Sequence, residues 1–142
     1  MYILDTNVLS EIMKETPDPA VVAWLSACPA DAVFTTAICQ TEILHGVRRL
    51  PDGNKRYRLN AAARAMFTQA FPARVFPFDE AAASVYADMR IARERAGRPL
   101  AVEDGMIAAI ARVVGAHVVT RDTAGFAGCG VPTVNPWEQS FP

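Results

Sequence analysis

The chain has 142 residues, an ordinary length for one domain and enough to bury an apolar core. Its composition is 51% hydrophobic and 20% charged with a net charge of −1, which excludes a disordered chain and a uniformly basic nucleic-acid-binding protein. Because Asp5 interrupts the apolar stretch at the N-terminus, we expect no signal peptide. The longest later apolar region, 106–119, contains Arg112 and His117 and is too short to span a bilayer, so we expect a cytoplasmic location.

Short runs rich in apolar and β-branched residues predict five strands, and helical patterns separate most of them. The predicted strands are 2–5, 32–35, 74–78, 117–120 and 132–134, and the predicted helices are 19–28, 37–50, 54–71, 79–96 and 103–114. Strands that alternate with helices favour a parallel sheet covered on both faces. We therefore expect one α/β domain over residues 1–142, with three layers (α/β/α) and a central, mostly parallel five-stranded sheet.

Apolar residues at helical spacing predict which helix faces are buried. The predicted inward-facing residues are Val21, Val22, Trp24 and Leu25 in the helix at 19–28, and Met106, Ile107, Ile110, Val113 and Val114 in the helix at 103–114. Asp79 is expected to cap the helix at 79–96, which Gly97 and Pro99 would end. Trp24, Met66 and Phe67 are candidates for an interface groove or a dimer surface, with a core position as the alternative.

Four acidic residues stand beside apolar segments: Asp5, Glu42, Asp104 and Asp122. Asp5 and Asp122 follow predicted strands, whereas Glu42 and Asp104 belong to predicted helices. In open parallel sheets, sites form outside the carboxyl ends of the strands, so all four side chains can converge on one rim. Carboxylates gathered in this way repel each other and are costly to bury unless a cation neutralises them. The pattern indicates a site for a hard divalent cation such as Mg²⁺ or Mn²⁺.

Each acidic residue also has a purely structural explanation. Asp5 could cap the first helix, and Asp122 could form an Asx-turn before Gly125. Asp104 suits a helix N-terminus, and Glu42 could be a surface residue. All four in one ordered set favour a shared site over four separate structural roles.

Two stretches concentrate basic residues and are candidate phosphate-contacting surfaces, with solvated helix faces as the alternative. The first contains Arg48, Arg49, Lys55, Arg56 and Arg58, and the second Arg90, Arg93, Arg95 and Arg98. The three cysteines and two histidines show no metal-ligand spacing, so we expect neither a disulfide framework nor a zinc site.

Four segments in this order resemble the PIN-domain signature, and most resemble the VapC toxins of the FitB-like branch. The segments are Leu4-Asp5-Thr6-Asn7-Val8, Thr41-Glu42-Ile43, Glu103-Asp104-Gly105-Met106-Ile107-Ala108-Ala109 and Thr120-Arg121-Asp122. The likeness extends from Tyr2 to Trp137. It implies a PIN fold and a metal-dependent endoribonuclease that acts as the toxin of a type II toxin–antitoxin system.

The resemblance also implies roles for individual residues. Its acidic, metal-binding and catalytic set corresponds to Asp5, Glu42, Asp104 and Asp122, and its polar supports correspond to Asn7 and Thr120. Asp5, Asp104 and Asp122 would hold one or two Mg²⁺ or Mn²⁺ ions. Glu42 would be a further ligand or would orient the attacking water. Arg121 could contact substrate phosphate or form a surface salt bridge, and Glu103 is expected to serve mainly as a helix-start residue.

The family further implies a cognate antitoxin, an RNA substrate, a homodimer and a larger toxin–antitoxin assembly. Which RNA is cut stays open. Three other functions are alternatives: a phospho-acceptor signalling domain, a phosphatase with an Asp nucleophile, and a non-catalytic RNA-binding module. The first would require adjacent acids after the first strand and a lysine near the last. The second would require a second Asp where Asn7 stands.

Overall fold

The structure, a computed structural model, describes residues 1–139; the last three residues of the predicted domain lie outside the described residues. The strands are β1 (Tyr2–Leu4), β2 (Val33–Thr36), β3 (Val75–Phe76), β4 (His117–Val119) and β5 (Thr133–Val134). The α-helices are α1 (Thr6–Ile12), α2 (Pro19–Ala27), α3 (Ala37–Arg48), α4 (Asn54–Ala65), α5 (Glu80–Arg95) and α6 (Val102–Val114). Short 3₁₀ turns cover Ala30–Ala32 and Thr123–Phe126.

The five strands form one sheet in the order β3-β2-β1-β4-β5, and every neighbouring pair is parallel. The strand β1 lies in the middle, because Tyr2 pairs with Val33 on one side and with His117 on the other. The strand order therefore reverses between β1 and β4. Such a switch point leaves a crevice at the carboxyl ends of the two strands, since their connections leave in opposite directions.

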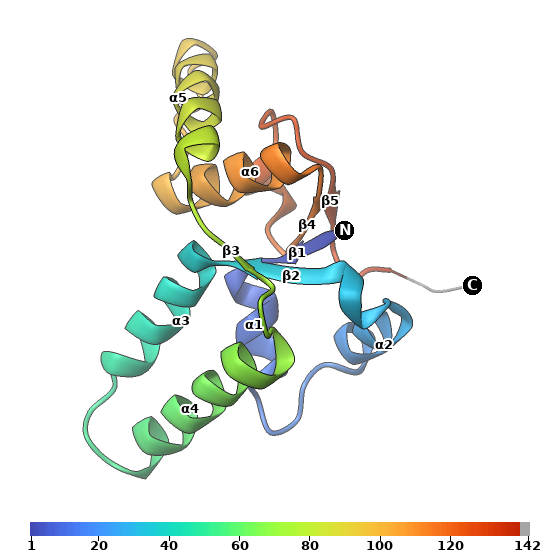
Figure 1. The fold of residues 1–142 in the computed structure, drawn as a ribbon, viewed down its shortest axis with the longest axis vertical. Coiled ribbons are helices and arrows are strands. Elements are labelled where there is room, and N and C mark those ends of the chain that lie inside the picture. Colours follow the sequence, from blue (N-terminus) through green and yellow to red (C-terminus); the bar gives the residue numbers. More distant parts are fainter. Residues whose placement is uncertain (140–142) are drawn as a thin grey trace.

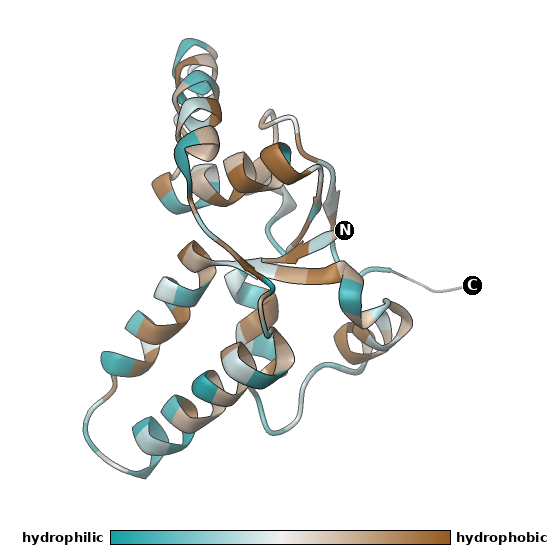
Figure 2. Ribbon diagram, in the orientation of Figure 1, coloured by the Kyte–Doolittle hydropathy of each residue, from teal (hydrophilic) through white to brown (hydrophobic). Residues whose placement is uncertain are grey.

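The helices cover both faces of the sheet, as predicted. Figure 1 shows α1 to α4 on one side of the sheet and α5 and α6 on the other. In Figure 2 the central strands and α6 are largely apolar, whereas the outer α4 alternates between apolar and polar residues. Ile3 in β1, Val118 in β4 and Ile107 in α6 are fully buried, which locates the core on both sides of the central strands.

Three details differ from the sequence predictions. Val22 and Val113 are 43% and 41% exposed, because the buried faces of α2 and α6 are narrower than their runs of apolar residues. The helix predicted over 54–71 is shorter in the structure. The α-helix ends with α4 at Ala65, and the chain continues as a π turn over Met66–Ala70. That turn directs Met66 and Phe67 into the core, where each is 8% exposed, which favours the core position over an interface groove. Trp24 is also buried.

The ends of α5 agree with the sequence predictions. The side chain of Asp79 caps the helix by accepting a hydrogen bond from the Ala82 N–H at 2.9 Å. The helix stops at Arg95, two residues before Gly97, whose φ of +69° lies in the left-handed region that favours glycine. Within residues 1–139, the structure has no helix that is both long and apolar enough to cross a membrane.

Two glycines inside helices should respond to the same substitution with opposite signs. A Cβ on Gly105 in α6 would lie 2.5 Å from Tyr86 Cε2 and 2.6 Å from Leu100 Cδ2. Gly105→Ala should therefore lower the free energy of unfolding by about 1–3 kcal/mol through overpacking. A Cβ on Gly46 in α3 would meet nothing within 4 Å, so Gly46→Ala should raise it by about 0.5–1 kcal/mol. Denaturant unfolding measures both, and equal effects would contradict this account of the α5–α6 packing.

Candidate functional site

The carboxylate of Asp5 lies at the carboxyl end of β1 and is only 6% exposed. Three donors hold it. Thr120 Oγ1 donates to Asp5 Oδ2 at 2.8 Å, Asn7 Nδ2 donates to the same oxygen at 3.2 Å, and the Thr6 N–H donates to Oδ1 at 2.8 Å. A buried carboxylate requires such donors, because leaving it unsatisfied costs several kcal/mol.

The same network joins the ends of β1 and β4. Asn7 Nδ2 also donates to Thr120 Oγ1 at 3.0 Å, and the Arg121 N–H donates to Asn7 Oδ1 at 3.1 Å. Thr120 is fully buried, and its hydroxyl oxygen accepts from the Asp122 N–H at 3.1 Å. The loop after β4, which carries Asp122, is therefore fixed relative to Asp5.

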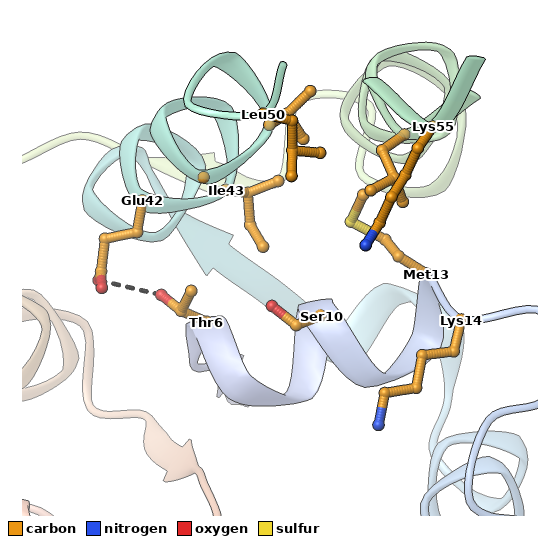
Figure 3. Close-up of a pocket in the computed structure, with 11 residues that line it drawn as sticks. Thr6, Ser10, Met13, Lys14, Glu42, Ile43, Leu50 and Lys55 are labelled. Atoms are coloured by element: carbon orange, nitrogen blue, oxygen red, sulfur yellow. Dashed lines mark hydrogen bonds between the residues drawn. The ribbon is translucent and has the colours of Figure 1, made fainter. Parts of the chain in front are cut away.

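Glu42 approaches the start of α1 from α3. It lies in the middle of α3, is half-buried, and accepts a hydrogen bond from Thr6 Oγ1 at 3.0 Å. Figure 3 shows the two side chains pointing toward one another from α3 and α1. Thr6 thus links the acid of α3 to the turn that begins with Asp5.

Asp104 and Asp122 meet at Gly125. A Cβ built on Gly125 would lie 2.9 Å from Asp122 Oδ2 and 3.0 Å from Asp104 Oδ2, so both oxygens border the space that a side chain would fill. Gly125 also donates its N–H to Asp122 Oδ1 at 3.2 Å. Asp104 is half-buried in the first turn of α6, and Asp122 is exposed.

The electrostatics of the acids show that they belong to one cluster. Burial raises the pKa of Asp104 to about 6, and the charges of Asp5, Asp122 and Glu103 add to the rise. Burial raises the pKa of Glu42, although its hydrogen bond from Thr6 opposes the rise. Burial also raises the pKa of Asp5, against the bonds from Thr120 and Thr6. Asp5, Glu42 and Asp104 are therefore costly to ionise in this cluster.

The structural explanations of two acids hold alongside their place in the cluster. Asp5 is the N-cap of α1, because its side chain accepts from the Thr6 N–H. Asp122 caps the 3₁₀ turn at Thr123–Phe126 through the Gly125 N–H. Capping uses Oδ1 in both residues, and the Oδ2 oxygen of Asp122 borders the space beside Gly125.

Two arginines have contacts that the sequence did not reveal. Arg93 in α5 is half-buried and donates to the carbonyls of Arg98, at 2.7 Å, and Ala127. It therefore clamps the loop that follows Asp122 and is not available as a phosphate-binding surface residue. Its charge also lowers the pKa of Asp104. The exposed Arg121 lies over the ring of Trp137, with 4.6 Å from Cζ to the ring centroid.

Sequence reasoning missed Thr6, Gly125 and Arg93 as parts of this site. Thr6 could have been suspected, because it stands inside the segment that resembles the family signature. Gly125 and Arg93 carry no local signal, since their partners come from distant elements. In residues 1–139, no three Asp, Glu, His or Cys side chains lie close enough together to form a complete set of metal ligands as they stand.

A groove of about 420 Å³ begins at the cluster and runs between α1, α3 and α4. Its floor is apolar, with Met13, Ile43, Val47, Leu50 and Leu59, and Thr6 and Glu42 stand at one end. Lys14 and Lys55 also line it (Figure 3). We call this the apolar groove.

A family model, known sequences and a solved structure all match this chain over most of its length. The family model of the PIN domain matches residues 2–128. The chain is 38% identical over 138 residues to the VapC ribonuclease Y4jK of Sinorhizobium fredii, with 97% of this chain and 99% of that protein covered. It is 38% identical over 137 residues to the toxin FitB of Neisseria gonorrhoeae, with coverage of 96% and 99%. In a solved structure of FitAB bound to the IR36 DNA fragment, one chain matches with a TM-score of 0.91 and 37% identity, and 99% of each chain is covered.

The raised pKa of Asp104 predicts how stability depends on pH. Between the pKa of an unfolded Asp, about 3.9, and about 6, the folded protein holds a proton that the unfolded chain has released. The free energy of unfolding should therefore fall as pH rises through this window. Asp104→Asn should flatten this part of the pH profile and stabilise the protein at neutral pH by on the order of 1 kcal/mol, allowing for solvent screening. Thermal unfolding with a chelator present measures both, and an unchanged profile would contradict the cluster electrostatics.

Proposed function

This chain belongs to the PIN-domain family, and from that premise we propose that it is an endoribonuclease that acts as the toxin of a toxin–antitoxin pair. The proposal is supported by the links among Asp5, Glu42, Asp104 and Asp122. Hydrogen bonds tie Asp5 to Thr120 and Glu42 to Thr6, and Asp104 and Asp122 both approach Gly125. The relatives named VapC ribonuclease and toxin FitB support the same activity. Residues 1–142 would act as one domain, and the location predicted from the sequence is the cytoplasm.

The donor atoms of this site suit a divalent cation in chemical type, although in residues 1–139 the acids would have to move closer together to hold one. All four side chains offer carboxylate oxygens, which Mg²⁺ and Mn²⁺ prefer, and Gly125 leaves open the space between Asp104 and Asp122. Asp5, Asp104 and Asp122 would hold the ion, and Glu42 would be a further ligand or would orient the attacking water. When bound, the ion supplies a water of lowered pKa and neutralises charge on the phosphodiester.

The chain's own polar residues prepare these carboxylates. Thr120 and Asn7 fix the orientation of the Asp5 side chain, and Thr6 fixes that of Glu42. Fixed orientations keep ligands in place without a loss of entropy at the moment of binding. Gly125 keeps the entrance to Asp104 and Asp122 free of a side chain.

The antitoxin would occupy the apolar groove. This surface adjoins Glu42, and its apolar floor is suited to the side chains of an inserted protein segment. A segment seated there would cover the way to the acidic cluster and so block RNA. The solved FitAB complex, which contains a similar chain, supports an antitoxin partner and a larger assembly. A homodimer stays a prediction of the family resemblance.

The rival functions lack support from particular residues. A phospho-acceptor domain would place a lysine near the last strands, but the only lysines are Lys14 and Lys55. Both line the apolar groove instead. A non-catalytic RNA-binding module would not require the carboxylates, so neutralising them separates that alternative from the nuclease.

The decisive experiment is cleavage of a panel of structured and single-stranded RNAs with Mg²⁺, Mn²⁺ or a chelator. The intact chain should cut at least one RNA only with metal, and Asp104→Asn should lower the rate on the order of a hundredfold or more, because a ligand and its charge are lost. Asp88→Asn, which changes an exposed acid on α5 in the same way, is the matched control and should cut normally. Cleavage that survives the chelator and Asp104→Asn would refute the proposed chemistry.

The role of Thr120 can be tested without turnover. Thr120→Val keeps the shape of the side chain but removes the donor to Asp5, so Mn²⁺ affinity should fall by about 10- to 100-fold. Isothermal titration with Mn²⁺ measures the change, and Thr123→Val on the exposed turn is the control. Equal affinities for the two variants would remove Thr120 from the proposed metal site.

A further inference from the structure

The tip of the hairpin formed by α3 and α4 carries a second hollow, separate from the apolar groove. Figure 1 shows this hairpin extending away from the sheet, with the connection between its helices at the far end. The hollow has a volume of about 410 Å³ and is lined by Arg48, Asp52, Gly53, Arg56, Tyr57 and Asn60. We call it the hairpin hollow. None of these residues takes part in the acidic cluster.

The hairpin tip is positively charged although the chain as a whole is not. Residues 45–60 contain five of the 14 basic residues and a single acidic one, Asp52, whereas the net charge of the chain is −1. Arg56 pairs with Asp52 at 2.6 Å, but Asp52 is almost fully exposed, so the pair contributes little to folding. Within residues 1–139, Arg48 has no ion pair, and its charge is available to a ligand.

Tyr57 is the most exposed of the large hydrophobic side chains in the described residues. Its exposed fraction is 77%, compared with 47% for Ile91 on α5. The ring forms part of the wall of the hairpin hollow and contributes little to the core. An accessible aromatic ring beside arginines is the arrangement on which single-stranded nucleic acids stack their bases.

We propose that the hairpin hollow is a nucleotide-binding subsite for single-stranded RNA, and this proposal rests on the proposed nuclease function. Tyr57 stacks on one base, and Arg48 and Arg56 contact the flanking phosphates. The amide of Asn60 meets the edge of the base. These side chains together would recognise single-stranded nucleotides at a distance from the phosphodiester bond that is cut.

The position along α3 connects this subsite to the acidic cluster. Glu42 and Arg48 lie six residues apart on the same helix, which corresponds to about 9 Å along its axis. A stacked strand advances about 3.4 Å per nucleotide, so about three nucleotides separate the two points. The two side chains also lie about 120° apart around the helix axis, so a strand that reaches both the acidic cluster and the hairpin hollow bends around α3.

The lining of the hollow favours RNA over a segment of a protein partner. The apolar groove offers five apolar side chains to a protein, whereas the hairpin hollow offers only the ring of Tyr57 among charged and polar groups. An acidic protein segment would gain the charge attraction but would find little apolar surface to bury. A nucleotide can stack its base on the ring and place its phosphate beside the arginines at the same time.

The first test measures binding of a fluorescein-labelled single-stranded RNA of mixed sequence by anisotropy, in an Asp104→Asn background that limits cleavage. Tyr57→Ala should weaken binding by about 5- to 150-fold, the range expected for losing one stacked base, while the salt dependence stays the same. Tyr57→Phe keeps the ring and should bind normally. Ile91→Ala, which removes an exposed apolar side chain from α5, is the matched control.

The second test separates local contacts from net charge. Arg48→Ala with Arg56→Ala should lower the slope of log affinity against log salt by about 1.4, since each lost phosphate contact on a single strand removes about 0.7. Arg95→Ala with Arg98→Ala removes the same charge from the exposed end of α5 and the segment that follows it, and should change the slope less. Equal effects of the two pairs would overturn the subsite, as would unchanged RNA binding by Tyr57→Ala.

Two further outcomes distinguish this subsite from the proposed function. If Tyr57→Ala in the otherwise intact chain cleaves RNA with an unchanged KM, the subsite is refuted and the nuclease stands. If the intact chain cuts no RNA but binds it through Tyr57, the subsite stands and the nuclease fails. If Tyr57→Ala weakens binding of the cognate antitoxin and not of RNA, the hollow belongs to a protein partner and the proposal is overturned.

Discussion

Burial of the Asp5 carboxylate is the constraint on which the site depends. An ionised carboxylate at the end of a central strand is tolerated only with donors in place, and those donors come from α1 and from the residue that follows β4. Thr120 can reach Asp5 because β1 and β4 are neighbours, which in turn requires the reversal of strand order. The order of the strands therefore determines which side chains can stabilise the Asp5 carboxylate at the edge of the sheet.

In the proposed site, the acidic cluster combines structural and chemical roles in the same side chains. Asp5 and Asp122 cap helical turns, so their orientations are set by the fold, while Asp104 and Glu42 contribute charge that burial makes costly. A site of this kind lowers the stability of the chain in exchange for ligands that are already oriented. Arg93 offsets part of that repulsion and also holds the neighbouring loop.

Much of the fold was predictable because its signals are local. The five strands are short apolar runs bounded by polar turns, and Asp79 and Gly97 mark the ends of α5. The width of the buried face of a helix depends on distant elements that pack against it. For this reason the sequence wrongly predicted that Val22 and Val113 face inward. The four acids could be found from their positions after strands and on helices together with a family resemblance. Gly125 could not be found in this way, because its place in the cluster depends on its proximity to Asp104, which lies on a different element.

The central place of β1 also determines when the acidic cluster can come into existence during protein synthesis. The first strand acquires its partner β4 only after residue 119 has been made, and Asp122 follows later still. A nascent chain on the ribosome that has not passed this point can form neither the Thr120–Asp5 bond nor the full set of acids. Pairing over so long a sequence separation is also slow. The proposed antitoxin could therefore be made while this chain is still being translated, before the acidic cluster is complete.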